Sequence, residues 1–198
     1  ASGTAAGGIW HLALVGWLSM RELPVESVTW ISINGSAPSL QELMAGGVDV
    51  VCCSVPEAQA LLDGGEIRCL GVMSDDRCAA APDVLTFAEQ GIHWSMGGWR
   101  GLMYPPNVPA ERVERMEKAA LKVAGSDEFQ RFMAAAGFHT VVTDGRRFAQ
   151  FLSEADAEFG AILSRPGMQQ QQRSPISRYF VPGLLGIAAT LVAVSGWL

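Results

Sequence analysis

Residues 28–54, VTWISINGSAPSLQELMAGGVDVVCCS, constrain the fold of this chain more than any other stretch. Residues 28–33 and 48–53 are short runs of β-branched and apolar side chains, which are typical of buried strands. Between them, Pro38 suits the first turn of a helix, and the pair Gly46-Gly47 ends that helix. Two short strands joined by a helix predict a parallel, right-handed crossover that is buried on both faces.

The loops that follow these two strands are the first candidates for a ligand site. In a parallel sheet, small ligands bind outside the carboxyl ends of the strands. We therefore expect ligand contacts from the residues that follow each strand, which are Asn34, Gly35, Ser36, Ala37, Cys53 and Ser54.

The chain begins with a loop of small residues, ASGTAAGG, which leads into a predicted helix over residues 9–23. A loop of this kind before a helix exposes backbone N–H groups and the positive end of the helix dipole, which suit a carboxylate or a phosphate. It is not a P-loop, because no Gly-Lys-Ser/Thr follows. The alternative is a flexible start of the chain without a binding role.

The remaining sequence alternates between helical and extended patterns, which predicts the α/β fold class. Ser126 and Asp144 are suited to cap the helices that follow them. Helices are expected over residues 56–62, 109–124, 126–137 and from 144 onward, and strands over residues 67–73, 101–104 and 139–142.

The C-terminal residues have a different composition. Residues 164–178 include four consecutive glutamines and predict a polar linker. Residues 179–198, YFVPGLLGIAATLVAVSGWL, contain no charge and are long enough, as a helix, to cross a bilayer. We therefore predict a C-terminal transmembrane helix that anchors the chain in the lipid bilayer; a buried soluble helix is the alternative.

Composition and motifs exclude several classes of function. The net charge is −6 and no basic stripe occurs, so no nucleic-acid partner is expected. The four cysteines form no CxxC pair, and the three histidines lack the spacing of metal ligands. No nucleophile elbow is present. We predict no catalytic residue, no metal site and no cofactor.

Four blocks in this order resemble the Bug family, the TctC-type solute receptors of tripartite tricarboxylate transporters. The blocks are INGSAPSLQELMAGGVDV, GGEIRCLGVMSDDR, APDVLTFAEQG and WRGLMYPPNVPAERVERM, within a receptor-like region over residues 1–163. The resemblance implies a fold like that of type II periplasmic binding proteins, in which two α/β lobes close over a small organic anion. It also implies that this chain corresponds to the second lobe and part of the first, without the N-terminal segment of the first lobe.

The resemblance further implies a periplasmic receptor, not an enzyme, that delivers a di- or tricarboxylate to the membrane permease subunits. Where the family usually has an acidic or amide residue after the second strand, this chain has Cys53-Ser54. The initial loop matches the family loop that meets the ligand carboxylate, so the expected ligand-binding set also includes Ser2, Gly3, Thr4, Ala5 and Gly7.

Two other classes of function remain open. The first is a membrane-tethered α/β interaction module, or a truncated or fused receptor fragment without function. The second is a small α/β enzyme, which would require a reactive group in the cleft.

Overall fold

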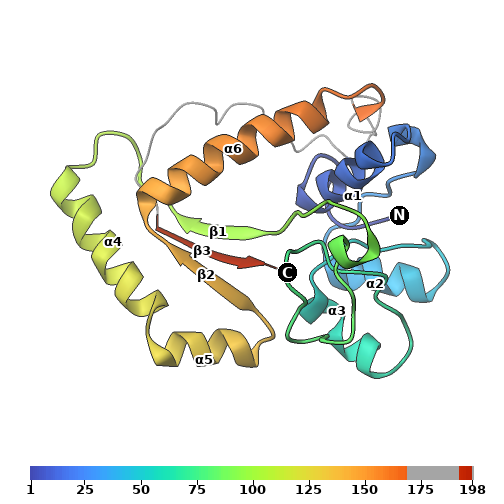
Figure 1. Ribbon diagram of the computed structural model, residues 1–198, viewed down its shortest axis with the longest axis horizontal. Coiled ribbons are helices and arrows are strands. Elements are labelled where there is room, and N and C mark those ends of the chain that lie inside the picture. Colours follow the sequence, from blue (N-terminus) through green and yellow to red (C-terminus); the bar gives the residue numbers. More distant parts are fainter. Residues whose placement is uncertain (169–191, 198) are drawn as a thin grey trace. The chain divides into compact units, whose positions relative to one another are not determined.

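The computed structural model describes residues 1–168 and 192–197, which belong to two compact units. The first unit contains Ala1–Gly97 together with the described residues from 159 to 168. The second contains Gly98–Glu158 and the strand β3 (Val192–Trp197) (Figure 1). Each unit has its own hydrophobic core.

Three parallel segments lie at the centre of the first unit. Ser2 forms parallel bridges with Ile31 on one side and with Val51 on the other. The Ser2 N–H group donates to the carbonyl oxygen of Val50 at 2.9 Å, and the Cys52 N–H group donates to the carbonyl oxygen of Ser2 at 2.9 Å. Residues from the start of the chain therefore form the middle segment of a small parallel sheet.

This arrangement confirms the parallel crossover predicted from residues 28–54 but changes its details. The predicted strands are present as single bridged residues rather than as long strands. Ser2, expected in a loop, lies between them. Within residues 1–97, the helices of this unit are α1 (Ile9–Met20), η1 (Val25–Ser27), α2 (Ser36–Met44), α3 (Val55–Asp63) and η2 (Ala88–Gln90).

Helix α1 is buried on most of its surface and contributes to two clusters of apolar side chains. Leu12 and Val15 pack in one cluster with Met96, while Leu14 and Leu18 pack in a second cluster with Trp30 and Ala6. The first cluster also includes Ile162, near the end of α6 (Gly145–Leu163), and the buried Met168.

Gly16 allows close packing of Trp94 on α1. A Cβ atom at Gly16 would overlap the indole ring of Trp94. The same ring donates a hydrogen bond from Nε1 to the carbonyl oxygen of Ala13 at 2.9 Å. The absence of a side chain at Gly16 is therefore required by the position of this indole.

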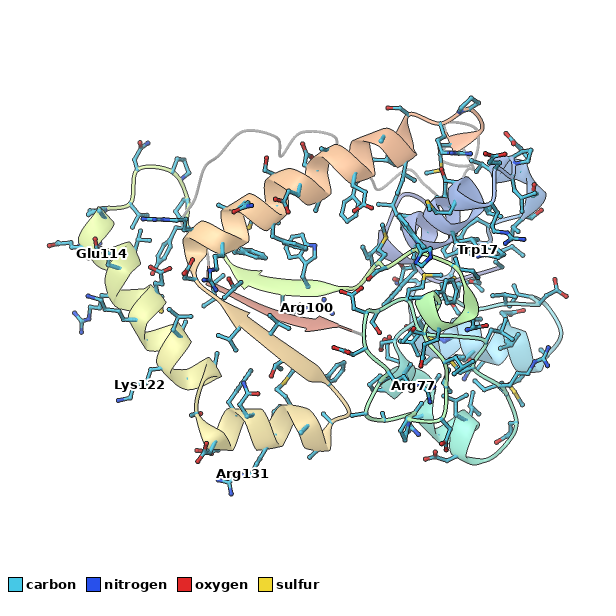
Figure 2. The ribbon with its side chains drawn as sticks, in the orientation of Figure 1. Trp17, Arg77, Arg100, Glu114, Lys122 and Arg131 are labelled. Carbon is cyan, nitrogen blue, oxygen red and sulfur yellow. The ribbon has the colours of Figure 1, made fainter. Side chains whose placement is uncertain are left out.

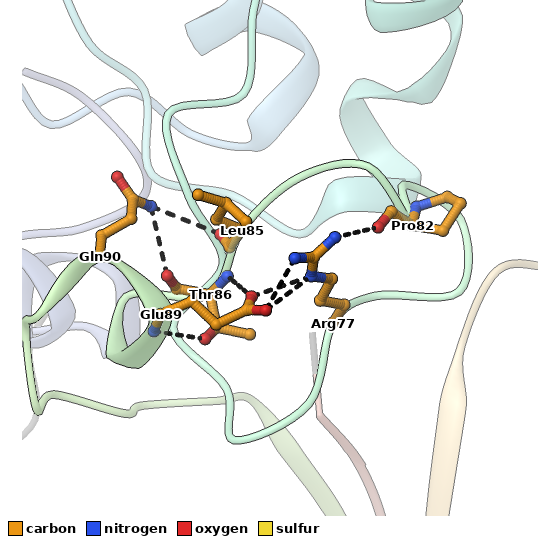
Figure 3. Close-up of polar contacts among 6 residues, drawn as sticks. All are labelled: Arg77, Pro82, Leu85, Thr86, Glu89 and Gln90. Carbon is orange, nitrogen blue, oxygen red and sulfur yellow. Dashed lines mark hydrogen bonds and ion pairs between the residues drawn. The ribbon is translucent and has the colours of Figure 1, made fainter.

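A surface cluster around Arg77 and Glu89 fixes the loop between the bridged residues Val72 and Thr86 (Figure 3). The Arg77 guanidinium donates to both oxygens of Glu89, at 2.7–2.9 Å, and to the Pro82 carbonyl oxygen at 3.1 Å. Glu89 also accepts from the Thr86 N–H group at 2.8 Å. These bonds hold the pKa of Glu89 at about 2, chiefly through Arg77 and then through Thr86.

The second unit contains a three-stranded antiparallel sheet of β1 (Trp99–Leu102), β2 (His139–Thr143) and β3, in the order β1-β3-β2. Trp99 lies opposite Ser195, and Val142 lies opposite Val194, so β3 is the central strand. The prediction of a strand at residues 139–142 is confirmed.

Helices surround this sheet and begin close to the predicted caps. The Ser126 hydroxyl accepts from the Phe129 N–H group at 3.3 Å, and Asp144 accepts from the Arg147 N–H group at 2.8 Å. Trp99 of β1 packs edge-on against Phe148, with ring centroids 5.3 Å apart. The helices are α4 (Ala110–Ala124), α5 (Asp127–Ala135) and α6 (Gly145–Leu163).

The two shorter helices of the second unit, α4 and α5, contact β2 and present charged side chains to solvent. Glu114 and Lys122 of α4 and Arg131 of α5 point away from the sheet (Figure 2). This amphipathic distribution is the one expected for a helix that covers one face of a sheet.

The predicted transmembrane helix over residues 179–198 is wrong. Val192–Trp197 form the central strand β3, and residues 179–191 lie outside the described residues. Across residues 1–168 and 192–197, no helix is both long and apolar enough to cross a membrane. A run of uncharged apolar residues is compatible with a membrane helix and also with a strand that has neighbours on both sides, and composition alone does not separate the two.

We predict that Gly16→Ala lowers the free energy of unfolding by about 1–3 kcal/mol, because the added methyl group overpacks the contact with Trp94. Urea unfolding followed by tryptophan fluorescence measures this change. Gly160→Ala in α6 is the control, because a Cβ atom there meets nothing within 4 Å. The control should gain up to about 1 kcal/mol from helix propensity; equal effects at both sites would contradict the packing argument.

We predict that Glu89→Gln lowers the melting temperature at neutral pH, and that this difference from the unchanged protein disappears in acid. The pKa of Glu89 lies at about 2 in the folded protein, below its value of about 4.3 in an unfolded chain. Its stabilising contribution is therefore complete above pH ~4.3 and is lost as the pH falls through ~2. Melting curves of both proteins across this range provide the test, and a difference that persists below pH 2 would contradict it.

Candidate functional site

The predicted ligand loops lie at one edge of the parallel segments in the first unit. Ser2, Ile31 and Val51 run in the same direction, so the chain leaves each of them at the same end of the small sheet. The loop after Ser2 leads into α1, the turn after Ile31 leads into α2, and Cys53-Ser54 lead into α3. The topology therefore brings together the three groups of residues predicted from the sequence. We call them the first loop (residues 2–8), the second loop (residues 34–37) and the third loop (residues 53–54).

Buried hydroxyl groups hold the first two loops together. Ser2 and Ser39 are both fully buried. The Ser2 hydroxyl lies 2.8 Å from the Ile31 carbonyl oxygen and 3.2 Å from the Ser39 hydroxyl. The Ser39 hydroxyl in turn reaches the carbonyl oxygens of Gly3, at 2.7 Å, and Gly35, at 2.8 Å. The buried hydroxyl groups of Ser2 and Ser39 thus fix the first two loops relative to each other.

Glu57 connects the second and third loops. Its Oε1 atom accepts a hydrogen bond from the Ser36 hydroxyl at 2.8 Å. Its Oε2 atom accepts from the Ser54 hydroxyl at 2.6 Å and from the Ser54 N–H group at 3.1 Å, as part of the capping box of α3. The hydroxyl groups of Ser36 and Ser54 are therefore engaged by a carboxylate of the protein itself.

The first loop rests on two aromatic rings. His11 is fully buried and stacks on Trp30, with ring centroids 4.7 Å apart. The His11 Nδ1 atom accepts from the Gly7 N–H group at 2.9 Å, and the Trp30 Nε1 group donates to the Thr4 carbonyl oxygen at 3.2 Å. A Cβ atom at Gly3 would lie 2.6 Å from the Trp30 ring, which explains the glycine at that position.

Several hydrogen-bond donors of the first two loops have no partner among the described residues. These donors include the Thr4 hydroxyl and the backbone N–H groups of Thr4 and Ala5. In the first turn of α2, the N–H groups of Ser36 and Ala37 likewise have no partner in the described part of the chain. Asn34 and Ala37 are exposed, and Gly35 has a φ of 115°, a backbone conformation that favours glycine. Together these neutral donors can hold an anion by hydrogen bonding.

The cysteines next to the third loop are uncharged at neutral pH. Burial raises the pKa of Cys52 to about 11. Burial, together with the nearby Glu57 carboxylate, raises the pKa of Cys53 to about 12. Cys53 is half-buried and carries a free thiol, so it offers at most a weak, neutral donor to a ligand. Within residues 1–168 and 192–197, no group of side chains is arranged to hold a metal ion.

Three residues at this edge were not among the residues predicted to form the site. Glu57 was detectable in principle, because Ser54-x-x-Glu57 has the spacing of a capping box. Ser39 and His11 each have one partner four residues away, Gly35 and Gly7. The contacts that connect them to other segments, Ser39 with Gly3 and His11 with Trp30, join residues distant in sequence, and no local pattern indicates them.

The comparison with protein families gives one match that covers most of the chain. Residues 14–168 match the family described as the tripartite tricarboxylate transporter family receptor. A UPF0065 protein of Bordetella pertussis is 28% identical over 73% of this chain and 45% of its own length. A UPF0065 protein from the gbd 5' region of Cupriavidus necator is 25% identical over 78% of this chain and 48% of its own length. The chain thus spans about half the length of the curated relatives that it matches.

Three solved structures share the fold, and this chain covers only a little over half of each. A TctC solute-binding protein from Polaromonas has a TM-score of 0.66 at 24% identity, with 82% of this chain and 56% of that chain covered. A Rhodopseudomonas palustris protein solved with adipate has a TM-score of 0.70 at 24% identity, with 82% and 54% covered. The MatC protein from the same species, solved with malate, has a TM-score of 0.66 at 20% identity, with 82% and 56% covered.

These likenesses show a periplasmic-binding-protein-like α/β fold. The family match extends over more than half of the residues. The family suggested by the four sequence blocks is therefore confirmed: this chain belongs to the tripartite tricarboxylate transporter receptor family.

Proposed function

We propose that this chain is the ligand-binding part of a tripartite tricarboxylate-type receptor, and that its three loops hold one carboxylate group of a small organic acid. The observation that carries the proposal is the cluster of neutral donors at one edge of the parallel segments, without a hydrogen-bond partner among the described residues. Oriented neutral dipoles can stabilise an anion without a nearby cation, as backbone nests and helix N-termini do.

The relatives and this donor set support a small organic acid as the ligand. One solved family structure contains adipate and another contains malate, and both ligands are small dicarboxylates. We infer that the first carboxylate of the ligand contacts the Thr4 hydroxyl and the N–H groups of Thr4 and Ala5, with Ala37 supplying a further donor. The absence of a side chain at Gly3, Gly7 and Gly35 lets the backbone of the loops come close to this carboxylate. Asn34 and Cys53 border the ligand.

The biological setting is part of the same proposal. Family membership supports a periplasmic receptor that passes its ligand to the permease subunits of the transporter. Capture would require closure of two lobes, driven by a higher affinity of the ligand for the closed state than for the open one. Because the chain spans about half the length of its relatives, these statements concern the whole receptor.

Isothermal titration calorimetry of the 198-residue chain against four- to six-carbon mono- and dicarboxylates tests the proposal. Saturable binding of one or more of these acids, with weak dependence on salt, is expected from a site built of neutral dipoles. No heat of binding with any acid, from a chain that unfolds cooperatively, would contradict a carboxylate site in these loops.

We predict that Thr4→Val lowers the affinity for a bound carboxylate about tenfold or more. The substitution keeps the shape of the side chain and removes one hydroxyl that donates to a charged group, a bond that contributes about 1.5–3 kcal/mol. Thr29→Val is the matched control, because the exposed Thr29 precedes the bridged Ile31 at the opposite end of its segment. Equal affinities of the two variants would argue against a role for Thr4.

A further inference from the structure

We propose that Ser39 and Trp30 are positioning residues for ligand binding: Ser39 sets the direction of the Thr4 N–H group, and Trp30 sets the direction of the Ala5 N–H group. In this role neither side chain touches the ligand. The inference rests on the proposed function, because it concerns two donors that would hold the ligand carboxylate. It deepens that function by naming the side chain that orients each donor.

The hydroxyl group of Ser39 holds the carbonyl group of Gly3. The Ser39 Oγ atom is fully buried and lies 2.7 Å from the Gly3 carbonyl oxygen. It also lies 2.8 Å from the carbonyl oxygen of Gly35, but that oxygen accepts from the backbone N–H group of Ser39 as well, at 3.3 Å. Among the described residues, Ser39 is the only donor to the Gly3 oxygen. The orientation of this carbonyl group therefore depends on one hydroxyl.

The carbonyl group of Gly3 and the N–H group of Thr4 belong to the same peptide group. The peptide bonds of the described residues are trans and planar, so an N–H group points in the direction opposite to the carbonyl group of its own peptide. The Thr4 N–H group therefore points away from the buried Ser39 hydroxyl. It has no partner among the described residues, so it is available to a ligand.

Trp30 acts in the same way on the next peptide group of the first loop. Its Nε1 group donates to the Thr4 carbonyl oxygen at 3.2 Å, and within the described part of the chain no other group donates to that oxygen. The Ala5 N–H group shares this peptide and therefore points away from the indole. The indole ring is itself buried and lies directly against Gly3. Two consecutive donors are thus oriented by two different side chains.

The backbone alone does not fix the first of these peptide groups. Glycine adopts a wide range of backbone angles, so the peptide group that follows Gly3 can rotate unless its carbonyl oxygen is held. Without the Ser39 hydroxyl, that oxygen would lose its partner in a buried position, and rotation toward another donor would become favourable. The Thr4 N–H group would rotate with it. A hydrogen bond weakens steeply when its donor is misaligned, so the ligand would lose this contact although Thr4 itself is unchanged.

The second loop supplies an internal reference. The Ser36 N–H group shares its peptide with the carbonyl group of Gly35, which keeps the backbone N–H group of Ser39 as a donor when the hydroxyl is removed. The direction of the Ser36 donor should therefore depend on neither the Ser39 hydroxyl nor the Trp30 indole. General loosening of the loops would instead affect the donors of Thr4, Ala5 and Ser36 alike.

Amide NMR spectra of the isotope-labelled 198-residue chain test the inference. The spectra are recorded with and without saturating adipate, malate or succinate, whichever binds most tightly in calorimetry. Binding should move the Thr4, Ala5 and Ser36 amide proton signals downfield. Ser39→Ala should remove most of the shift at Thr4 alone, and Trp30→Phe should remove most of the shift at Ala5 alone. Each variant should bind about tenfold more weakly, as expected for one lost hydrogen bond to a charged group.

Thr86→Val is the matched control, because it removes another buried hydroxyl of the first unit, one that accepts from the Glu89 N–H group at 3.1 Å. It should leave the affinity and all three shifts unchanged. Equal losses at all three signals in Ser39→Ala or Trp30→Phe, unchanged shifts in these variants, or the same losses in the control would overturn the inference. Binding that moves none of the three signals would also overturn it, whereas absence of binding would contradict the proposed function itself.

Discussion

The backbone pairing of Ser2 with two neighbours determines the geometry of the whole candidate site. Its N–H and carbonyl groups are both satisfied by the segment around Val51, while the residue before it, Ala1, accepts from the N–H group of Ile31 at 2.9 Å. Because parallel pairing fixes the direction of each segment as well as its distance from its neighbour, the loops after all three segments leave this sheet at one edge. The buried hydroxyl groups of Ser2 and Ser39 then fix the loops relative to one another.

A consequence of this construction is that most side-chain donors near the site serve the protein. Ser2 and Ser39 bond to loop carbonyl groups, and Ser36 and Ser54 bond to Glu57. Among the described residues of the loops, what remains for a ligand is mainly backbone N–H groups, together with the hydroxyl of Thr4 and the exposed side chain of Asn34. A site of this kind recognises the shape and charge of an anion through oriented amides, and the rigidity of the surrounding bonds limits the reorganisation needed on binding.

The sequence was informative wherever structure is decided locally. The helices at residues 109–124 and 126–137 and the caps at Ser126 and Asp144 follow from side chains within a few positions of one another. The family and the positions of the three loops also followed from the sequence. The extent of the strands did not, and Ser2 was missed as a bridged residue, because ladder bonds depend on partners that are 29 and 49 residues away. The membrane helix was wrong at Val192–Trp197, where the same apolar run satisfies its backbone groups by pairing with β1 and β2.

Helix α1 gives the first unit a property that concerns folding rather than binding. One side of the helix packs with Met96 and Ile162, and another packs with Trp30 and Ala6. Because both clusters contain side chains of α1, unfolding of this helix removes side chains from both clusters at once. The parts of this unit that contact α1 should therefore open together as one cooperative unit of hydrogen exchange. The segments around Ser2 and Ile31, which precede the first two loops, should then open with the same free energy as α1.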